Sequence, residues 1–260
     1  MPSRVLEQRE ANVVHLIIDG DTPLNILSRA TLLELRQVLL RLTEDPDVAA
    51  LILTATGARA FSAGANLREI AELTPATALE FSHLGQSVTS LLADFPAPVI
   101  AALNGLAYGG GLELAVACDF RIASEDARFS YPSSKLGILP GFGGTQRCPM
   151  LIGPSRSKEL MFLGRVIDAE EALAWGLVNA VVPAEAVLGE ARKWASDLAE
   201  RSTYAIRQVK ECIGMTERAD FFFEQEAFAN CFRRPEVQEG IRAWLESTTH
   251  AQPDPASERA

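Results

Sequence analysis

Short apolar runs bounded by turn residues alternate with helical patterns in the first half of the chain. Three runs have the length and composition of buried strands: Val13–Asp19, Ala49–Thr54 and Pro98–Leu103. After the first run, Ser28 has the position of a helix N-cap. Apolar residues follow it at helical spacing on one face: Leu32, Leu35, Val38, Leu39 and Leu42. This alternation predicts an α/β core with largely parallel strand pairing.

The last third of the chain has a helical pattern. One helix is predicted to open at Pro183, with apolar residues along one side: Leu188, Ala191, Trp194, Ala195 and Leu198. Further helices are predicted at about 203–213, 217–231 and 235–246. The aromatic residues Phe221–Phe223, Phe228 and Phe232 suit either packing on the chain's own core or a subunit interface.

Composition places the chain among ordinary globular proteins. Of its 260 residues, 48% are hydrophobic and 22% are charged, which suffices for one large domain or a core with a smaller helical piece. No apolar run approaches the roughly 20 residues that span a bilayer. The polar start, MPSRVLEQRE, lacks the pattern of a signal peptide. We therefore expect a cytoplasmic protein with no membrane partner.

The net charge and the spacing of the cysteines and histidines argue against several kinds of partner. The net charge of −10 disfavours nucleic acid and anionic membrane surfaces. The four cysteines are widely separated without a CxxC pair, and the three histidines are isolated. We therefore expect neither a disulfide framework nor a metal site.

Two glycine-rich turns, each between a strand and a helix start, carry the strongest chemical signal. In Asn104–Glu113 (NGLAYGGGLE), three successive glycines leave peptide N–H groups uncovered where a helix begins. Ala60–Glu69 (AFSAGANLRE) follows the second strand and leads into a helix near Leu67. Together the turns can aim two N–H groups at one oxygen, as an oxyanion hole requires. Tight packing at the glycines and a favourable helix dipole at Glu113 explain the same residues without chemistry.

A third segment and three missing motifs narrow the chemistry. Ala127–Thr145 (ARFSYPSSKLGILPGFGGT) is rich in Gly, Pro and Ser yet hydrophobic, which is typical of an irregular loop that lines a site. The GGGxE sequence lacks the spacing of a Rossmann fingerprint, and the sequence has neither a Walker A motif nor a GxSxG elbow. Dinucleotide binding, P-loop chemistry and a hydrolase-type serine nucleophile are therefore without support.

Taken together, these segments resemble those of the crotonase superfamily, the enoyl-CoA hydratase/isomerase family. FSAGANLREI is similar to the family's first oxyanion motif and NGLAYGGGLELAVACDF to its second. ARFSYPSSKLGILPGFGGTQR is similar to the active-site loop that follows. AEEALAWGLVNAVVP and EVQEGIRAWLE resemble later landmarks, so the resemblance covers about residues 10–247.

The resemblance implies an α/β fold, a crotonase-like spiral of ββα units followed by C-terminal helices that trimerise. Residues 1–200 are expected to form the core with the acyl-CoA site, and residues 201–260 the oligomerisation region. The expected assembly is a homotrimer or a dimer of trimers. The expected partner is an acyl-CoA substrate, and no cofactor is implied beyond the coenzyme A of that thioester.

The resemblance also implies roles for residues of the site. The N–H groups of Ala65 and Gly110 would form the oxyanion hole for the thioester carbonyl, and Glu113 matches the first catalytic glutamate. The CoA moiety is expected along Leu24, Ser62, Ala63, Gly64, Asn66 and Arg68. The substrate pocket is expected to include Tyr131, Ser134 and Gly141.

The chain departs from the family's pattern at Ser133. Hydratases of the family usually have a second glutamate directly after the proline of this loop, where this chain has the sequence YPSS. Two carboxylates let one group activate water while the other handles the proton at the α-carbon. Here Glu113 must do both, or a hydroxyl of Ser133, Ser134 or Tyr131 assists it. Ser133 is therefore the second candidate catalytic residue.

Three kinds of function remain open at this stage. The first choice is an enoyl-CoA hydratase, a lyase that adds water to a 2-enoyl-CoA or removes it. Decarboxylation, isomerisation or hydrolysis of a specialised acyl-CoA keeps the same oxyanion hole, and a decarboxylase needs no second carboxylate. A trimeric acyl-CoA-binding protein without catalysis is the alternative from another class, although Glu113 and both glycine-rich turns argue against it.

Overall fold

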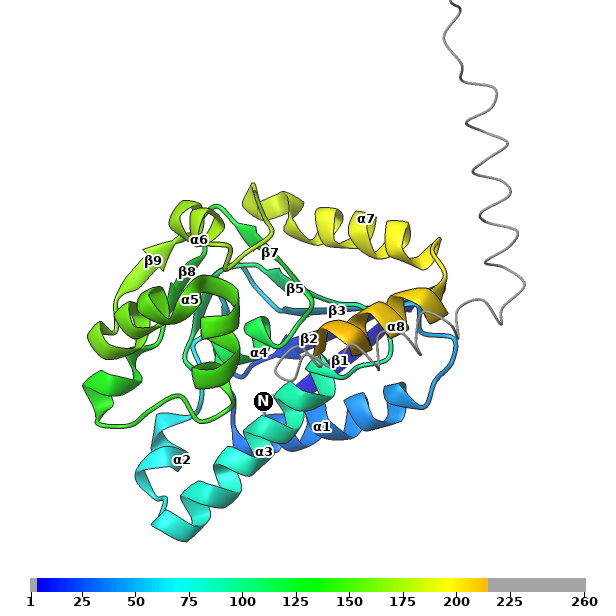
Figure 1. Ribbon diagram of the computed structural model, residues 1–260. Helices are drawn as coiled ribbons and strands as arrows, with labels where there is room; N and C mark the ends of the chain where they lie inside the picture. Colours follow the sequence, from blue (N-terminus) through cyan, green and yellow to red (C-terminus); the bar gives the residue numbers. More distant parts are fainter. Residues whose placement is uncertain (1–3, 215–260) are drawn as a thin grey trace, which may run out of the picture. The chain divides into compact units, whose positions relative to one another are not determined.

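Six strands form the larger of two sheets (Figure 1) in the order β1-β2-β3-β5-β7-β10. The computed structural model describes residues 4–214. The strands are β1 (Arg4–Glu10), β2 (Val13–Asp19), β3 (Ala50–Ala55), β5 (Val99–Leu103), β7 (Phe120–Ser124) and β10 (Ala180–Val182). β1 and β2 pair antiparallel, and every other pair in this sheet is parallel. The prediction of an α/β core with largely parallel pairing is confirmed.

Four three-residue strands form a second sheet, which the sequence pattern did not predict. They are β4 (Ala60–Ser62), β6 (Leu106–Tyr108), β8 (Arg128–Ser130) and β9 (Val166–Asp168), in that spatial order. The first three run parallel, and β9 pairs antiparallel with β8. The segment Ala127–Thr145, expected to be irregular, therefore opens with a strand. A three-residue strand is too short for an alternating pattern to reveal it.

Eight α-helices are described. They are α1 (Arg29–Thr43), α2 (Leu67–Ala71), α3 (Pro75–Ala93), α4 (Gly110–Val116), α5 (Gly144–Leu163), α6 (Ala169–Trp175), α7 (Val187–Ala199) and α8 (Thr203–Gly214), with 3₁₀ helices η1 (Pro132–Leu136) and η2 (Ala184–Ala186). Of the α-helices, α3, α5 and α6 were not predicted from the sequence pattern. Ser28 is the N-cap of α1, as predicted, and its hydroxyl accepts the N–H of Thr31 at 3.1 Å. Pro183 does not open α7, because η2 comes first and the helix begins at Val187.

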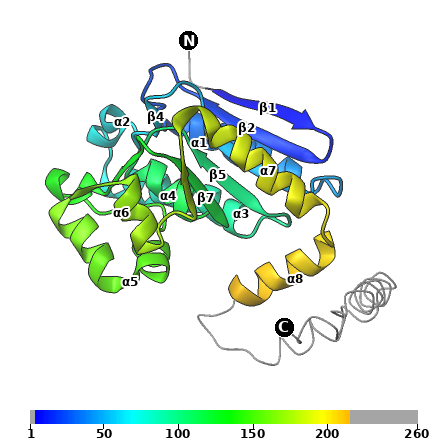
Figure 2. The same ribbon diagram turned by 90° about the horizontal axis from the view of Figure 1, so that it is seen from above.

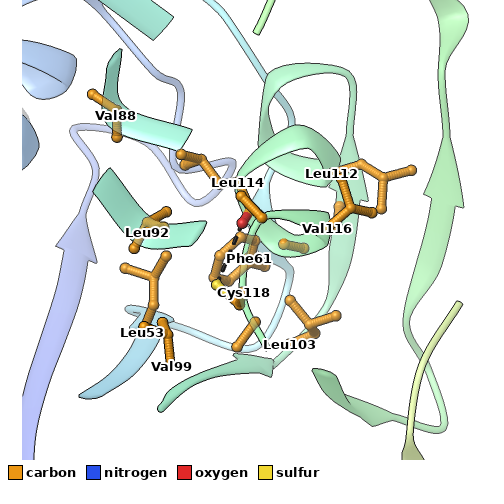
Figure 3. Close-up of a cluster of buried hydrophobic side chains, with 14 of the residues drawn as sticks. Leu53, Phe61, Val88, Leu92, Val99, Leu103, Leu112, Leu114, Val116 and Cys118 are labelled. Atoms are coloured by element: carbon orange, nitrogen blue, oxygen red, sulfur yellow. Dashed lines mark hydrogen bonds between the residues drawn. The ribbon is translucent and has the colours of Figure 1, made fainter. Parts of the chain in front are cut away.

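Both faces of the larger sheet are buried along its central strands, β2, β3, β5 and β7. In Figures 1 and 2, α7 lies along one face and α1 and α3 lie on the other. Along β3, Ala50 and Ile52 pack toward α7, whereas Leu51 and Leu53 belong to the main core. This alternation is the two-residue period of a strand. Figure 3 shows part of the main core around α4, where the thiol of Cys118 donates to the carbonyl of Leu114 at 3.4 Å.

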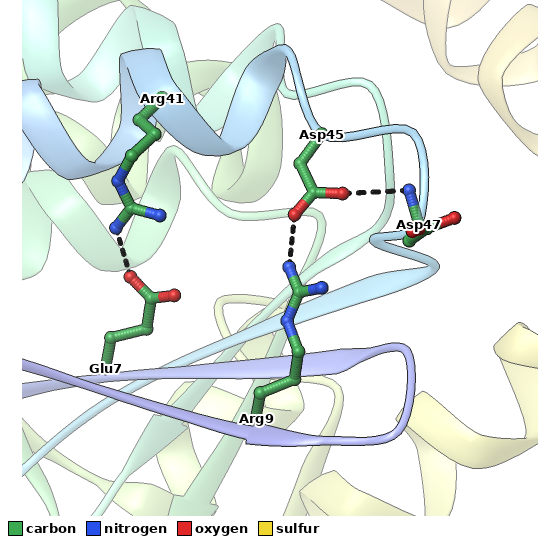
Figure 4. Close-up of polar contacts among 5 residues, drawn as sticks. All are labelled: Glu7, Arg9, Arg41, Asp45 and Asp47. Carbon is green, nitrogen blue, oxygen red and sulfur yellow. Dashed lines mark hydrogen bonds and ion pairs between the residues drawn. The ribbon is translucent and has the colours of Figure 1, made fainter.

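Ion pairs attach the edge strand β1 to the region around α1 (Figure 4). Arg41 of α1 pairs with Glu7, and Arg9 pairs with Asp45, which also accepts the N–H of Asp47 at 3.0 Å. Only one side chain of β1 is buried, and most of the others are exposed. A strand with so polar a sequence gives no apolar pattern, which explains why it was not predicted.

The described residues fall into two units, 4–203 and 204–214. The predicted helix at 203–213 is confirmed as α8. The helices predicted at 217–231 and 235–246, and the phenylalanines from 221 to 232, lie outside the described residues. The oligomerisation role of residues 201–260 stays a prediction. Across residues 4–214, none of the helices has the length and apolar character that a bilayer crossing requires.

Candidate active site

Glu113 lies in the first turn of α4, with only 3% of the residue exposed. Its Oε1 accepts two backbone N–H groups, from Phe142 at 2.7 Å and from Gly144 at 2.8 Å. Gly144 is the first residue of α5, so the carboxylate sits against the start of that helix. Both of these hydrogen bonds go to the same carboxylate oxygen, and the backbone N–H of Gly141 also acts on the carboxyl group. Oε1 is thus held in place, and Oε2 takes part in neither of these two bonds.

Burial brings the pKa of Glu113 into the neutral range. Loss of water raises this pKa, whereas the hydrogen bonds from Gly144 and Phe142, the charge of Arg147 and the N–H of Gly141 lower it. The net pKa is about 7, against 4.5 for an ordinary glutamate. Burial is the largest of these effects. A carboxyl group that titrates near pH 7 can accept a proton and return it, as general acid–base catalysis requires.

The two glycine-rich turns lie against each other. Gly64 has a φ of +99°, and a Cβ atom there would stand 2.7 Å from the carbonyl oxygen of Tyr108 and 3.2 Å from the nitrogen of Gly110. Only glycine permits this approach. A Cβ atom at Gly110 would stand 3.5 Å from the nitrogen of Ala65. The structure therefore brings the two predicted oxyanion residues together, and neither N–H donates to another described residue.

Side-chain hydrogen bonds fix the shape of the first turn. Asn25 is buried with a φ of +48°, and its Nδ2 donates to the carbonyl of Ala60 at 2.7 Å. The hydroxyl of Ser62 donates to the carbonyl of Asn25 at 2.7 Å and accepts the N–H of Gly64 at 3.1 Å. Ser62 was predicted to contact CoA. Its hydroxyl already braces the turn, and this role was not predicted.

The other predicted CoA-binding residues lie around the same turn. Ala63 donates its N–H to the carbonyl of Leu24 at 2.9 Å, which joins the two loops expected along the CoA moiety. Asn66 is the N-cap of α2, and its side chain accepts the N–H of Arg68 at 3.1 Å. The side chain of Arg68 is exposed and has no partner among residues 4–214. It is a cation placed at the rim of this turn, where an anionic group can reach it.

The loop that lacks the second glutamate places three hydroxyl groups in different surroundings. Ser133 is 7% exposed and its hydroxyl makes no hydrogen bond to described residues. The Tyr131 hydroxyl is fully buried without a partner, and burial raises the pKa of this phenol well above its usual value. A Cβ atom at Gly144 would lie 3.0 Å from both the Tyr131 hydroxyl and Glu113 Oε1, so the hydroxyl flanks the glutamate. Ser134 is exposed and donates to the carbonyl of Phe162 at 3.1 Å.

Helix α3 holds the loop that clamps Glu113, and sequence reasoning missed this contact. Gly141, predicted to line the substrate pocket, accepts a hydrogen bond through its carbonyl from the Ser82 hydroxyl at 2.6 Å. The carbonyl of Phe142 accepts one from the Thr89 hydroxyl at 2.7 Å. Arg147 donates to Thr89 at 3.0 Å. In the sequence these residues of α3 form an ordinary polar pattern. Nothing in that pattern indicates that they contact the loop.

Metal-binding groups do not gather around this site. Within the described part of the chain, no three His, Cys, Asp or Glu side chains are placed to hold one ion.

A comparison with known sequences identifies the family. The sequence model of the enoyl-CoA hydratase/isomerase family matches residues 8–252. This chain belongs to that family. A crotonyl-CoA hydratase of Syntrophomonas wolfei is 40% identical over 93% of this chain and 95% of its own length. A short-chain-enoyl-CoA hydratase of Clostridium acetobutylicum is 38% identical over 94% of this chain and 95% of its own.

Solved structures of the family agree with the fold described above. An enoyl-CoA hydratase from Bacillus anthracis, 36% identical in sequence, superposes with a TM-score of 0.89 and covers 94% of this chain and 96% of that one. The DspI protein of Pseudomonas aeruginosa is 37% identical and superposes equally well, with a TM-score of 0.89 over 94% of each chain. The predicted resemblance and the crotonase-like α/β fold are therefore confirmed. The protein is an enzyme of a lyase family.

Proposed function

We propose that the protein is an enoyl-CoA hydratase, which adds water across the C2=C3 bond of a 2-enoyl-CoA or catalyses the reverse dehydration. Glu113 carries the proposal, because it is a buried carboxyl with a pKa of about 7, and Oε2 takes part in neither of the two bonds that hold Oε1. The hydratase names of relatives similar over nearly the whole chain support hydration over decarboxylation, isomerisation or hydrolysis. They equally disfavour a binding protein without catalysis.

In the proposed reaction, the N–H groups of Ala65 and Gly110 donate to the thioester carbonyl. Negative charge develops on that oxygen when water adds at C3, and preorganised donors stabilise it. Glu113 takes a proton from the attacking water. The same carboxyl group then gives a proton to C2 of the enolate, which restores the thioester carbonyl and yields the 3-hydroxyacyl-CoA. Addition at C3 and protonation at C2 occur on the face occupied by Glu113, so the addition is syn.

Hydroxyl groups take the place of the second carboxylate in this proposal. A neutral serine is no strong base near pH 7, and the raised pKa of the Tyr131 phenol keeps it protonated. Ser133 and Tyr131 therefore act as hydrogen-bonding groups that orient the water, and all proton transfer falls to Glu113. A buried hydroxyl without a partner is costly, so a water molecule beside Tyr131 would also satisfy that group.

The proposal extends to binding and assembly. The CoA moiety lies along the Leu24 and Ser62–Asn66 loops, with Arg68 available to a phosphate group, and no further cofactor takes part. The protein is cytoplasmic and assembles as a homotrimer or a dimer of trimers. The exposed side chain of Arg68 and the neighbouring backbone groups of the two loops support this placement of CoA.

The decisive test is hydration of crotonyl-CoA, followed as loss of the enoyl absorbance and confirmed by mass spectrometry of the 3-hydroxybutyryl-CoA product. We expect turnover by the wild type. A protein that binds CoA esters but leaves crotonyl-CoA unchanged would contradict hydration of simple enoyl-CoAs. Malonyl-type and cyclic acyl-CoA substrates would then be assayed next.

Replacing Ser133 by glutamate is expected to raise kcat on crotonyl-CoA about tenfold or more, because the variant regains a second carboxylate for water activation. A second carboxylate at the position of the family's second glutamate should also raise the pKa of Glu113 and move the pH dependence to higher pH. The control is Ser134→Glu, which adds the same charge at the exposed neighbouring position and should give no gain. Equal rates for both variants would show that the missing carboxylate does not limit the reaction.

The pH dependence of kcat/KM should follow the titration of Glu113. Because burial raises its pKa to about 7, the protonated and inactive form persists at pH values where an ordinary glutamate is ionised. The rate should therefore fall about tenfold per pH unit below the pKa and reach a plateau above it. The measurement is kcat/KM for crotonyl-CoA from pH 5 to 9 at constant ionic strength. A flat profile between pH 5 and 8 would show that the base titrates elsewhere.

A further inference from the structure

The side chain of Phe142 borders the reacting groups on a side that the mechanism does not use. Its backbone N–H holds Glu113, while its ring is a separate feature and is only 4% exposed. A Cβ atom at Gly110 would stand 2.9 Å from Cε2 of this ring. The ring therefore lies against the backbone of one proposed oxyanion donor, next to the residue that carries out proton transfer.

On its other side, the ring packs into helix α3. A Cβ atom at Gly85 would stand only 1.9 Å from Cδ1 of Phe142, so no other residue fits at position 85 while the ring is in place. Glycine weakens a helix interior, and a glycine in the middle of α3 is explained by the space that the ring needs. Phe81, one turn earlier, packs on the ring with centroids 5.5 Å apart. The ring thus fills the gap between α3 and the start of α4.

We propose that the ring of Phe142 closes the acyl end of the site and restricts the substrate to short 2-enoyl chains. The proposal rests on the proposed function, because it places the thioester carbonyl at Ala65 and Gly110. In this proposal the oxygen is fixed, C2 and C3 lie beside Glu113, and the carbons beyond C3 extend toward Phe142, whose N–H holds Glu113. The ring lies between Gly110 and Gly85 on that side, so a long chain would have a path only after the ring is removed.

Phe142→Ala is expected to raise the ratio of kcat/KM for 2-decenoyl-CoA to kcat/KM for crotonyl-CoA about tenfold or more. Each newly buried methylene adds about fourfold in binding, and the space of a phenyl ring accepts only some of the six additional carbons. The matched control is Phe81→Ala, which removes the neighbouring ring of the pair and leaves Phe142 against Gly110. This control should keep the wild-type ratio.

Phe142→Ala could change the substrate ratio either by opening a path for the acyl chain or by loosening the packing of the core. A second variant distinguishes these two explanations. In Phe142→Ala with Gly85→Leu, the new side chain enters the space of the ring from α3, because the Cβ of residue 85 points directly at it. The double variant should recover the wild-type ratio. An unchanged ratio in a folded Phe142→Ala protein, or a double variant that behaves like the single one, would overturn the proposal.

Binding of saturated acyl-CoA esters tests the chain-length role of Phe142 without depending on hydration. Butyryl-CoA and decanoyl-CoA are titrated by calorimetry into wild type, Phe142→Ala and the double variant. If the wild type hydrates nothing, hydration is refuted, yet a tenfold gain for decanoyl-CoA over butyryl-CoA in Phe142→Ala alone still upholds the chain-length role. If crotonyl-CoA is hydrated but binding shows no such gain, the chain-length role fails and hydration stands.

Discussion

Glu113→Gln is expected to lower kcat for crotonyl-CoA by about 10²- to 10⁴-fold, because one carboxyl group performs both proton transfers. Glutamine keeps an oxygen that accepts the N–H groups of Phe142 and Gly144, so the clamp survives. KM should change little, since the oxyanion donors and the CoA contacts stay intact. The measurement is the steady-state loss of enoyl absorbance at pH 8, where the wild-type carboxyl is ionised.

The stability of this variant supplies the control. In the folded protein the pKa of Glu113 is about 7, above its ordinary value of 4.5. The contribution of this group to stability is therefore greatest below pH 4.5 and is lost as the pH rises through 7. Above that point the buried charge costs on the order of 3 kcal/mol. Glutamine carries no such charge, so Glu113→Gln should melt at a higher temperature than the wild type at pH 8. A stable variant that retains activity within tenfold of the wild type would show that another group is the base.

The strands and helices that could be predicted from the sequence are those whose burial produces a recognisable run or spacing of apolar residues. β2, β3 and β5 are buried strands and follow from their apolar runs, and α1 follows from its N-cap and its apolar face. The strands of the second sheet are fixed by tertiary pairing over three residues, and β1 is fixed by its antiparallel backbone pairing with β2, to which ion pairs of its polar side chains are added. Neither kind of contact leaves a period in the sequence.

The residues of the candidate site were also predictable only in part. Resemblance led to Ala65, Gly110 and Glu113, because their surroundings are continuous motifs. It did not lead to the clamp on Glu113, since the N–H donor of Phe142 lies 29 residues further along the chain and acts through backbone atoms that any residue has. The sequence also did not show in which direction the side chains of the active-site loop point. Tyr131 turns toward Glu113 and Ser134 turns away, a difference set by η1 and the packing of α5.

Gly110→Pro is expected to lower kcat by about 10²- to 10³-fold, because proline removes the N–H that donates to the developing oxyanion. Gly110 is the first residue of α4, the one helical position where proline is well tolerated. The helix should therefore persist, and Glu113 should remain in its first turn. Circular dichroism and the binding of butyryl-CoA report on the fold and on the CoA contacts, while turnover of crotonyl-CoA reports on the N–H group.

The matched control is Gly110→Ala, since any side chain at this position brings a Cβ atom to 2.9 Å from the Phe142 ring. Alanine brings the same Cβ atom as proline but keeps the N–H, so the ratio of the two rates separates the effect of replacing the N–H from the contact of Cβ with the ring. We expect alanine to lose a small part of the activity and proline most of it. Equal losses in the two variants would mean that the N–H of Gly110 stabilises no charge, and the oxyanion would then have to be stabilised by the N–H of Ala65 alone.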